Sequence, residues 1–266
     1  MRQKKQIPWK TIGLTLLAAL VGGAVGYWGM CQVDALGLPG LFALLALLVL
    51  AYVLQIVVHE GGHLVCGLLT GYRALSFRIG RMLLVKLDGR WKLRAYHIPG
   101  TGGQCLMAPP AQENPPYRLY HLGGGLANLL LAALALPVFL LTGAPLLRVF
   151  AGALVLIGGW IAGTNLLPMK MGGVANDGYN ARNLGKDPLA LQCSCVQLWI
   201  VEALQEGYSL AGMPEEWFDL PPKADLQNVL IMGTAIQRAS RLMARGELEE
   251  ADRAIRALLR GGHELL

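Results

Sequence analysis

Four long apolar stretches occupy the first two thirds of the chain, and polar segments separate them. Each stretch has about 20 residues or more, the length of α-helix that crosses a hydrocarbon core of roughly 30 Å. The pattern therefore predicts membrane-spanning helices at about residues 11–30, 41–70, 117–141 and 146–167. After residue 178 the composition changes to that of a soluble helical tail. We expect an all-α polytopic membrane protein, with a membrane-embedded core at 1–178 and a cytoplasmic α-helical tail at 179–266.

Composition and charge agree with this interpretation. The chain of 266 residues is 54% hydrophobic and 15% charged, which is typical of a polytopic membrane protein. The first apolar stretch lacks a small-x-small cleavage motif, so we interpret it as a retained anchor and not as a signal peptide. With a cytoplasmic N-terminus, 22 of the 23 basic residues fall on cytoplasmic segments and only Arg148 lies outside, as the positive-inside rule requires. We therefore expect an integral protein of a bacterial cell membrane with both termini cytoplasmic. The net charge of +6 then reflects contact with anionic headgroups rather than with nucleic acid.

The segment between the second and third stretches has the pattern of strands. Two runs of alternating apolar and basic residues flank Asp88-Gly89. Asp-Gly at such a position favours a two-residue hairpin turn, because a type I′ turn needs positive φ at both central residues. We predict a small membrane-associated β-hairpin insert at about 72–105, with Lys86, Arg90, Lys92 and Arg94 on one face and Val85, Leu87, Trp91, Leu93 and Ala95 on the other. Its free edge could receive an extended peptide, or the ribbon could simply anchor the loop.

The second apolar stretch ends in the motif His59-Glu60-Gly61-Gly62-His63. In a helix, histidines four residues apart lie roughly 40° apart around the axis and one turn above each other. Both imidazoles can then reach one metal ion, and tetrahedral Zn²⁺ is the metal that such a pair favours. Glu60 can act as the general base that takes a proton from water activated by the metal. About 18 uncharged residues precede the motif, and ionisable groups at membrane depth are functional candidates because their insertion is costly. The predicted topology puts this site in the cytoplasmic half of the membrane.

Three polar residues in the later segments are further candidates. Two histidines leave a catalytic zinc one protein ligand short, and a carboxylate is a standard third ligand. Asp177 is the only acidic residue between Glu113 and Asp187. Asn128 in the third span either contacts a substrate carbonyl or holds helices together, and Asn165 is a polar residue shortly before Pro168, which ends or kinks the fourth span.

Together these motifs resemble those of the site-2 proteases, the intramembrane zinc metalloproteases. The resemblance covers residues 41–178 and rests on His59-Glu60-x-x-His63, on Gly-Gly-x-Leu-Ala-Asn128, and on Asn165-x-x-Pro168 followed by Asp177-Gly178. It implies His59, His63 and Asp177 as zinc ligands, Glu60 as general base, and Asn128 and Asn165 near the active site or substrate. Gly125 departs from the family, which commonly has proline there, and the stretch from Pro168 to Asp177 is longer than usual.

We therefore expect an intramembrane zinc endopeptidase that cleaves a membrane-spanning or membrane-associated peptide in regulated intramembrane proteolysis. The alternative is a non-catalytic zinc-binding membrane adaptor or scaffold, which would act through a protein partner or self-association of residues 179–266; a metal transporter ranks third. Cys66 lies seven residues after His59 on the same helical face, so it is an alternative ligand or a packing residue. Residues 239–251 of the tail resemble one tetratricopeptide hairpin, too few for a stable solenoid.

Overall fold

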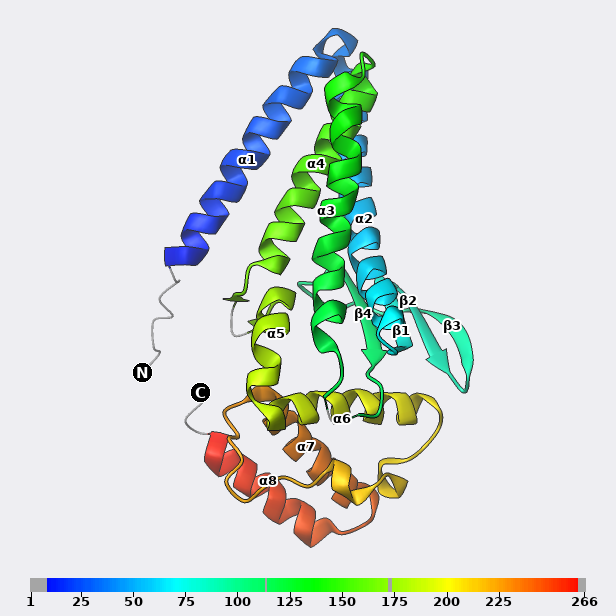
Figure 1. Cartoon of the computed structure of the whole chain (residues 1–266), viewed down its shortest axis with the longest axis vertical. Helices are drawn as coiled ribbons and strands as arrows, with labels where there is room; N and C mark the ends of the chain where they lie inside the picture. Colours follow the sequence, from blue (N-terminus) through cyan, green and yellow to red (C-terminus); the bar gives the residue numbers. More distant parts are fainter. Residues whose placement is uncertain (1–8, 113, 172–173, 263–266) are drawn as a thin grey trace. The chain divides into compact units, whose positions relative to one another are not determined.

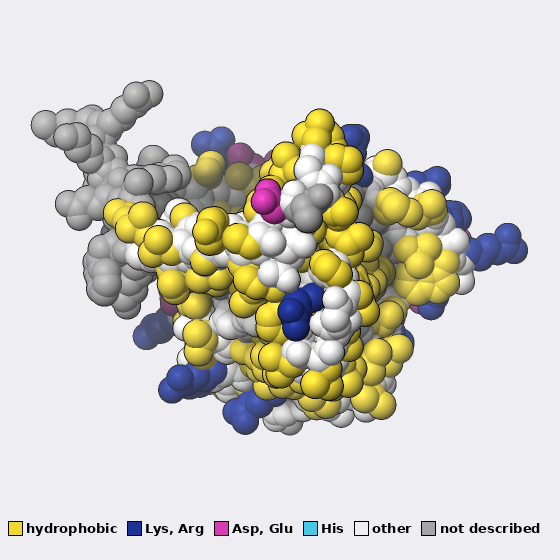
Figure 2. All heavy atoms as spheres, turned by 90° about the horizontal axis from the view of Figure 1, so that it is seen from above, with side chains coloured by type: hydrophobic (Ala, Val, Ile, Leu, Met, Phe, Trp, Pro, Cys, Tyr) yellow, Lys and Arg dark blue, Asp and Glu magenta, His cyan; other side chains and the backbone are white. Residues whose placement is uncertain are grey.

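The computed structural model describes residues 9–112, 114–171 and 174–262, so Arg2, Lys4 and Lys5 lie outside the described residues. Within these residues, four helices are long and apolar enough to cross a membrane (Figure 1): α1 (Trp9–Val33), α2 (Gly37–Leu69), α3 (Tyr117–Leu141) and α4 (Pro145–Leu166). The face presented in Figure 2 carries mostly hydrophobic side chains (yellow) and few charged ones. The helices predicted from the apolar stretches are therefore confirmed, and a membrane location is plausible.

The chain folds as two compact units, Met1–Gly62 with Gly124–Gly178, and His63–Gly123 with Tyr179–Leu266. The division cuts α2 and α3 and groups the segment between these two helices with the tail; its last boundary falls between Gly178 and Tyr179. In the first unit α2, α3 and α4 pack through small buried residues, namely Ala51, Ala135 and Ala153. Small side chains let the backbones of membrane helices approach closely.

The segment between α2 and α3 is a four-stranded antiparallel sheet of order β3-β2-β1-β4, built from β1 (Arg73–Ile79), β2 (Met82–Leu87), β3 (Arg90–Ala95) and β4 (Gly103–Ala108). The predicted turn is confirmed, since Asp88 and Gly89 have φ of 52° and 72° and Leu87 pairs with Arg90. The single hairpin expected at 72–105 was incomplete, because β1 and β4 add two further strands. β3 lies at one edge of the sheet.

The predicted faces of the hairpin are wrong. Cross-strand partners point to the same face, and the register pairs Lys86 with Trp91 and Val85 with Lys92. Across this two-residue turn an odd-numbered residue of one strand pairs with an even-numbered residue of the other. The even-numbered residues of β2 therefore lie on the same face as the odd-numbered residues of β3. One face therefore carries exposed apolar side chains beside Lys86, and the other carries the basic residues of β3. The exposed apolar side chains are Met82, Leu84, Trp91 and Leu93.

The tail is helical, as expected, and consists of α5 (Asp177–Asn183), α6 (Pro188–Gln205), α7 (Val229–Ala244) and α8 (Leu248–Gly262). Asp187 caps α6 by accepting a hydrogen bond from the Ala190 N–H at 3.0 Å. α7 begins after Asn228, whose side chain caps it by accepting a hydrogen bond from the Leu230 N–H at 3.1 Å. Short 3₁₀ helices span Asp34–Leu36, Leu184–Lys186, Leu210–Gly212 and Glu215–Trp217, and the two-residue strands β5 (Lys170–Met171) and β6 (Val174–Ala175) pair with each other.

Candidate metal centre

His59, His63 and Asp177 come together as predicted. Each offers one ligand atom, and these atoms all lie within 4.8 Å of one another. Both histidines stand on α2, one turn apart, because the helix continues without a break through Gly61 and Gly62. His59 and His63 are only 9% and 7% exposed, so the cluster is largely shielded from solvent.

The distance between His59 and Asp177 fits a tetrahedral metal ion. His59 Nε2 lies 3.4 Å from Asp177 Oδ2. Zn²⁺ holds nitrogen and oxygen ligands at about 2.0–2.2 Å, which separates two tetrahedral ligands by roughly 3.4 Å. A lone pair on Nε2 and a carboxylate at this distance repel each other unless a proton or a metal cation lies between them. The donor set of two imidazoles and one carboxylate therefore fits a catalytic zinc site, which keeps its fourth position for water or substrate.

The Nδ1 atom of each histidine is held by an acceptor, which leaves Nε2 for a metal. His63 Nδ1 lies 2.8 Å from the backbone carbonyl of Tyr120, and a carbonyl can only accept, so Nδ1 carries the proton. His59 Nδ1 lies 2.7 Å from Oδ1 of Asn128. Partners of this kind fix the tautomer and the ring orientation of metal-binding histidines.

Asn128 is wholly buried, with 0% of its surface exposed. Its amide nitrogen donates to the backbone carbonyl of Gln55 at 2.8 Å and to Gln55 Oε1 at 2.6 Å. Sequence reasoning missed Gln55, which is also 0% exposed. The signal was present, because Gln55 is an amide in an apolar run and stands one turn before His59 on the same helix face.

Asp177 reaches the cluster although the stretch after Pro168 is long. Part of that stretch closes on itself as β5 and β6. Asn176, which sequence reasoning also missed, then ties the end of the stretch to α4: its amide donates to the Thr164 carbonyl at 2.7 Å and to the Leu167 carbonyl at 2.6 Å. The extra residues therefore form a loop that returns to the end of α4, and Asp177 stays close to that helix.

Two glycines allow close packing around the end of α4. A Cβ on Gly178 would collide with the Leu166 carbonyl, so only glycine can follow Asp177 here. A Cβ on Gly125 would meet the Leu166 side chain at 2.5 Å. Gly125, which stands where site-2 proteases commonly have proline, thus lets α3 approach α4 close to the segment that carries Asp177.

The remaining candidates have distinct places. Glu60 is 7% exposed and lies between the two histidines in sequence, three residues before His63 on the same face of α2. Asn165 donates to the Ile161 carbonyl of its own helix at 2.9 Å and is half-buried. Among the described residues the ligand cluster consists of the two histidines and Asp177, without Cys66.

Other reactive side chains in the described part of the chain lack the features of a site. Cys193 and Cys195 are buried in α6, and burial raises the pKa of the Cys195 thiol to about 11, so this thiol stays protonated at neutral pH.

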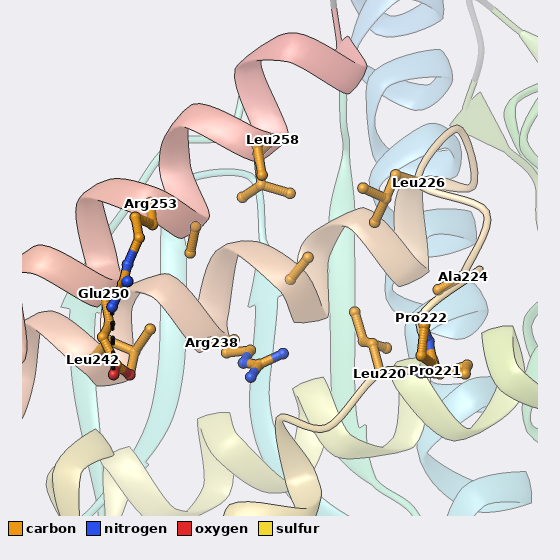
Figure 3. Close-up of a pocket in the computed structure, with 13 residues that line it drawn as sticks. Leu220, Pro221, Pro222, Ala224, Leu226, Arg238, Leu242, Glu250, Arg253 and Leu258 are labelled. Carbon is orange, nitrogen blue, oxygen red and sulfur yellow. Dashed lines mark ion pairs between the residues drawn. The ribbon is translucent and has the colours of Figure 1, made fainter.

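A groove of about 520 Å³ between α7, α8 and residues 220–226 is lined mainly by apolar side chains (Figure 3). Its Glu250 and Arg253 form an exposed ion pair at 3.6 Å, and exposed pairs of this kind contribute little energy.

Comparison of the chain with protein-family models, with curated proteins and with solved structures found no match.

Proposed function

We propose that this chain is an intramembrane zinc endopeptidase. The proposal rests on one observation above all, the gathering of His59, His63 and Asp177 beside a buried carboxylate, Glu60, on a helix long enough to cross a membrane. A structural zinc site needs no such base, whereas hydrolysis does. The resemblance of the motifs to those of site-2 proteases supports the same function.

Each residue has a role in this proposal. His59, His63 and Asp177 would hold the metal, which as Zn²⁺ supplies a Lewis acid that polarises the scissile carbonyl and makes water more acidic. Glu60 takes a proton from the attacking water on its carboxylate and delivers it to the leaving amine. Asn128 orients His59, and its complete burial keeps it from contacting a substrate.

The substrate in this proposal is a membrane-spanning or membrane-associated peptide, and the edge strand β3 receives it in extended form. The Tyr96 N–H donates to the Arg81 carbonyl at 2.9 Å. Because ladder hydrogen bonds alternate along an antiparallel strand, the N–H groups of Trp91 and Leu93 point to the open edge. A helical substrate must unwind before a bond can be cut, and pairing with this edge offsets the loss of its helical hydrogen bonds.

The edge is tested by Leu93→Pro, which removes an outward N–H and leaves the ladder to β2 in place. One main-chain hydrogen bond has a net value of about 1 kcal/mol, so we expect kcat/KM to fall about fivefold or more, with zinc content and membrane insertion unchanged. Leu93→Ala keeps the N–H and serves as the control. Equal cleavage by the two variants would leave the hairpin as an anchor only.

The proposed topology has both termini in the cytoplasm and the metal centre in the cytoplasmic half of the membrane. It is supported by the basic residues, which are concentrated on the segments before α1, between α2 and α3, and after α4. Reporter fusions after Leu38, Gly100, Thr142 and Leu266 should read outside, inside, outside and inside. An outside signal after Gly100 would contradict the topology.

The decisive experiment for the enzyme compares the unaltered protein with Glu60→Gln. The substitution preserves shape and metal ligands but removes the base, and general-base catalysis typically contributes 10²–10⁴-fold. We expect zinc to stay bound while cleavage falls at least about a hundredfold, and mass spectrometry of membrane peptides should find uncut substrates accumulating. Identical peptide profiles with zinc bound in both proteins would indicate a non-catalytic adaptor instead.

A further inference from the structure

Four buried polar groups form a chain of hydrogen bonds that ends on the metal-facing histidine. The Leu154 carbonyl on α4 accepts from Gln55 Nε2 at 2.8 Å. Gln55 Oε1 accepts from Asn128 Nδ2 at 2.6 Å, and Asn128 Oδ1 lies 2.7 Å from His59 Nδ1. All members belong to the first compact unit.

The direction of this chain is fixed by the backbone. The Leu154 carbonyl can only accept, so the Gln55 side chain must turn its NH₂ toward α4 and its oxygen toward Asn128. Asn128 must then turn its NH₂ toward Gln55, where the Gln55 backbone carbonyl is a second acceptor at 2.8 Å. Its oxygen is left facing His59, whose Nδ1 has to donate. In the neutral imidazole Nε2 then bears the lone pair, and it is Nε2 that lies 3.4 Å from Asp177.

We infer that Gln55 is a positioning residue for the metal centre, acting through Asn128 to fix the tautomer and ring orientation of His59. The inference rests on the metal at His59, His63 and Asp177 proposed above. Gln55 and Asn128 are both 0% exposed, so neither amide can exchange its partners for water. Without the Gln55 side chain, only the Gln55 backbone carbonyl still accepts from the Asn128 NH₂, so the Asn128 amide, and with it the His59 ring, is held less firmly.

Gly158 on α4 makes room for this arrangement. A Cβ on Gly158 would collide with the Gln55 amide nitrogen, whereas a Cβ on the adjacent Gly159 has nothing within 4 Å. Gly158→Ala therefore displaces the Gln55 amide from a helix that contributes no metal ligand, and Gly159→Ala is a matched control in the same turn.

The test measures metal affinity, with Zn²⁺ alone as the probe in competition with a chromophoric chelator, on the full chain in detergent. Removing an outer partner of a metal-binding histidine typically lowers metal affinity about 10–100-fold. We expect that loss for Gln55→Met and Gly158→Ala and no loss for Gly159→Ala. The intensity of the Co²⁺ absorption bands, which reports ligand geometry, should fall in the first two variants and not in the third.

A double-mutant cycle separates positioning from general damage to packing. Asn128→Leu removes the amide through which Gln55 acts on His59. Gln55→Met should therefore cost about 10-fold or more in Zn²⁺ affinity beside the native Asn128 and less than about twofold beside Asn128→Leu. An equal loss in both backgrounds would show that Gln55 acts only through packing and would overturn the inference.

The outcomes distinguish this inference from the proposed function. Unchanged Zn²⁺ affinity in Gln55→Met and Gly158→Ala would overturn the positioning role and leave the protease proposal intact. Loss of affinity in these variants of a protein that binds Zn²⁺ but cleaves nothing would support the positioning role and contradict the protease. An unaltered chain that binds no Zn²⁺ would overturn both.

Discussion

His59 and His63 stand one turn apart on α2 and turn Nε2 toward the same cluster, yet their Nδ1 atoms are held in different ways. His63 meets a backbone carbonyl, that of Tyr120. His59 meets a side chain, Asn128, whose own orientation depends on Gln55. A carbonyl within α3 has a fixed direction, whereas an amide can rotate by half a turn. The orientation of His63 is thus insensitive to a change of the Tyr120 side chain. The orientation of His59 depends on the side chains of Asn128 and Gln55 and can be disturbed by substitutions there.

The largest effect should come from removing either imidazole, because the two are equivalent as ligands. We expect His59→Ala and His63→Ala each to lower Zn²⁺ affinity on the order of a thousandfold, since loss of one ligand removes a large share of a binding energy of about 10–16 kcal/mol. Metal analysis after dialysis against a chelator measures this loss. If a variant keeps its zinc, the substituted histidine is not a ligand, and the comparison of the two histidines as ligands fails.

Asp177→Asn tests the ligand that faces His59 Nε2. A neutral amide oxygen is a weaker zinc ligand than a carboxylate, so we expect Zn²⁺ affinity to fall on the order of a hundredfold and cleavage to be lost. The control is Asp187→Asn, because asparagine is as good a helix cap as aspartate and α6 should keep its start. Full zinc content and activity in Asp177→Asn would direct the search for a third ligand to Cys66.

Asn128→Leu should affect the orientation of His59, which a side chain holds, and leave that of His63, which a backbone carbonyl holds. It removes the acceptor for His59 and leaves the Gln55 amide without its partner. Zn²⁺ affinity should fall about 10–100-fold, less than for loss of a ligand. Chelator competition measures the change, and a thermal unfolding curve in detergent shows whether the helices still pack. Unaltered affinity would mean that His59 keeps its orientation without Asn128.

Tyr120→Phe should have the smallest effect, because it leaves the backbone carbonyl that holds His63. The substitution removes one hydrogen bond, from the Tyr120 hydroxyl to the Cys105 carbonyl at 2.8 Å. A loss of about 1 kcal/mol should lower Tm by a few degrees while Zn²⁺ affinity stays unchanged. A fall in affinity comparable to that of Asn128→Leu would erase the contrast between the two histidines.

The contrast also explains what could be predicted from sequence. The motif at His59 and His63 could be identified because helical spacing alone brings these side chains to one face. The turn at Asp88-Gly89 could be identified because both residues need positive φ. Asn128 was noticed as a polar residue in an apolar span, but its partner could not be chosen between substrate and helix. The carbonyl of Tyr120 has no sequence signature, since every residue has one.

Other features depend on pairing between distant segments. β1 pairs with β4 across a separation that contains another hairpin, and no local turn signal marks that pairing. The hairpin faces were predicted wrongly because the even-numbered residues of both strands were placed on one face. The register across the two-residue turn puts even-numbered residues of β2 opposite odd-numbered residues of β3. The return of Asp177 to α4 depends on Asn176, whose carbonyl partners belong to the backbone and are invisible in the sequence.

The attachment of α6 to the sheet has a consequence for any shortened form of this protein. Arg73 in β1 forms a two-pronged ion pair with Glu202, with both N–O distances 2.6 Å. The Trp199 indole donates to the Pro109 carbonyl at 2.9 Å, and the Asp88 N–H donates to the Gln205 carbonyl at 2.8 Å. A fragment that ends before α6 would lose all three attachments and uncover residues of the sheet that are buried in the whole chain. Such a fragment should be insoluble or rapidly degraded in cells, so the tail is better regarded as part of the folding unit than as a detachable appendage.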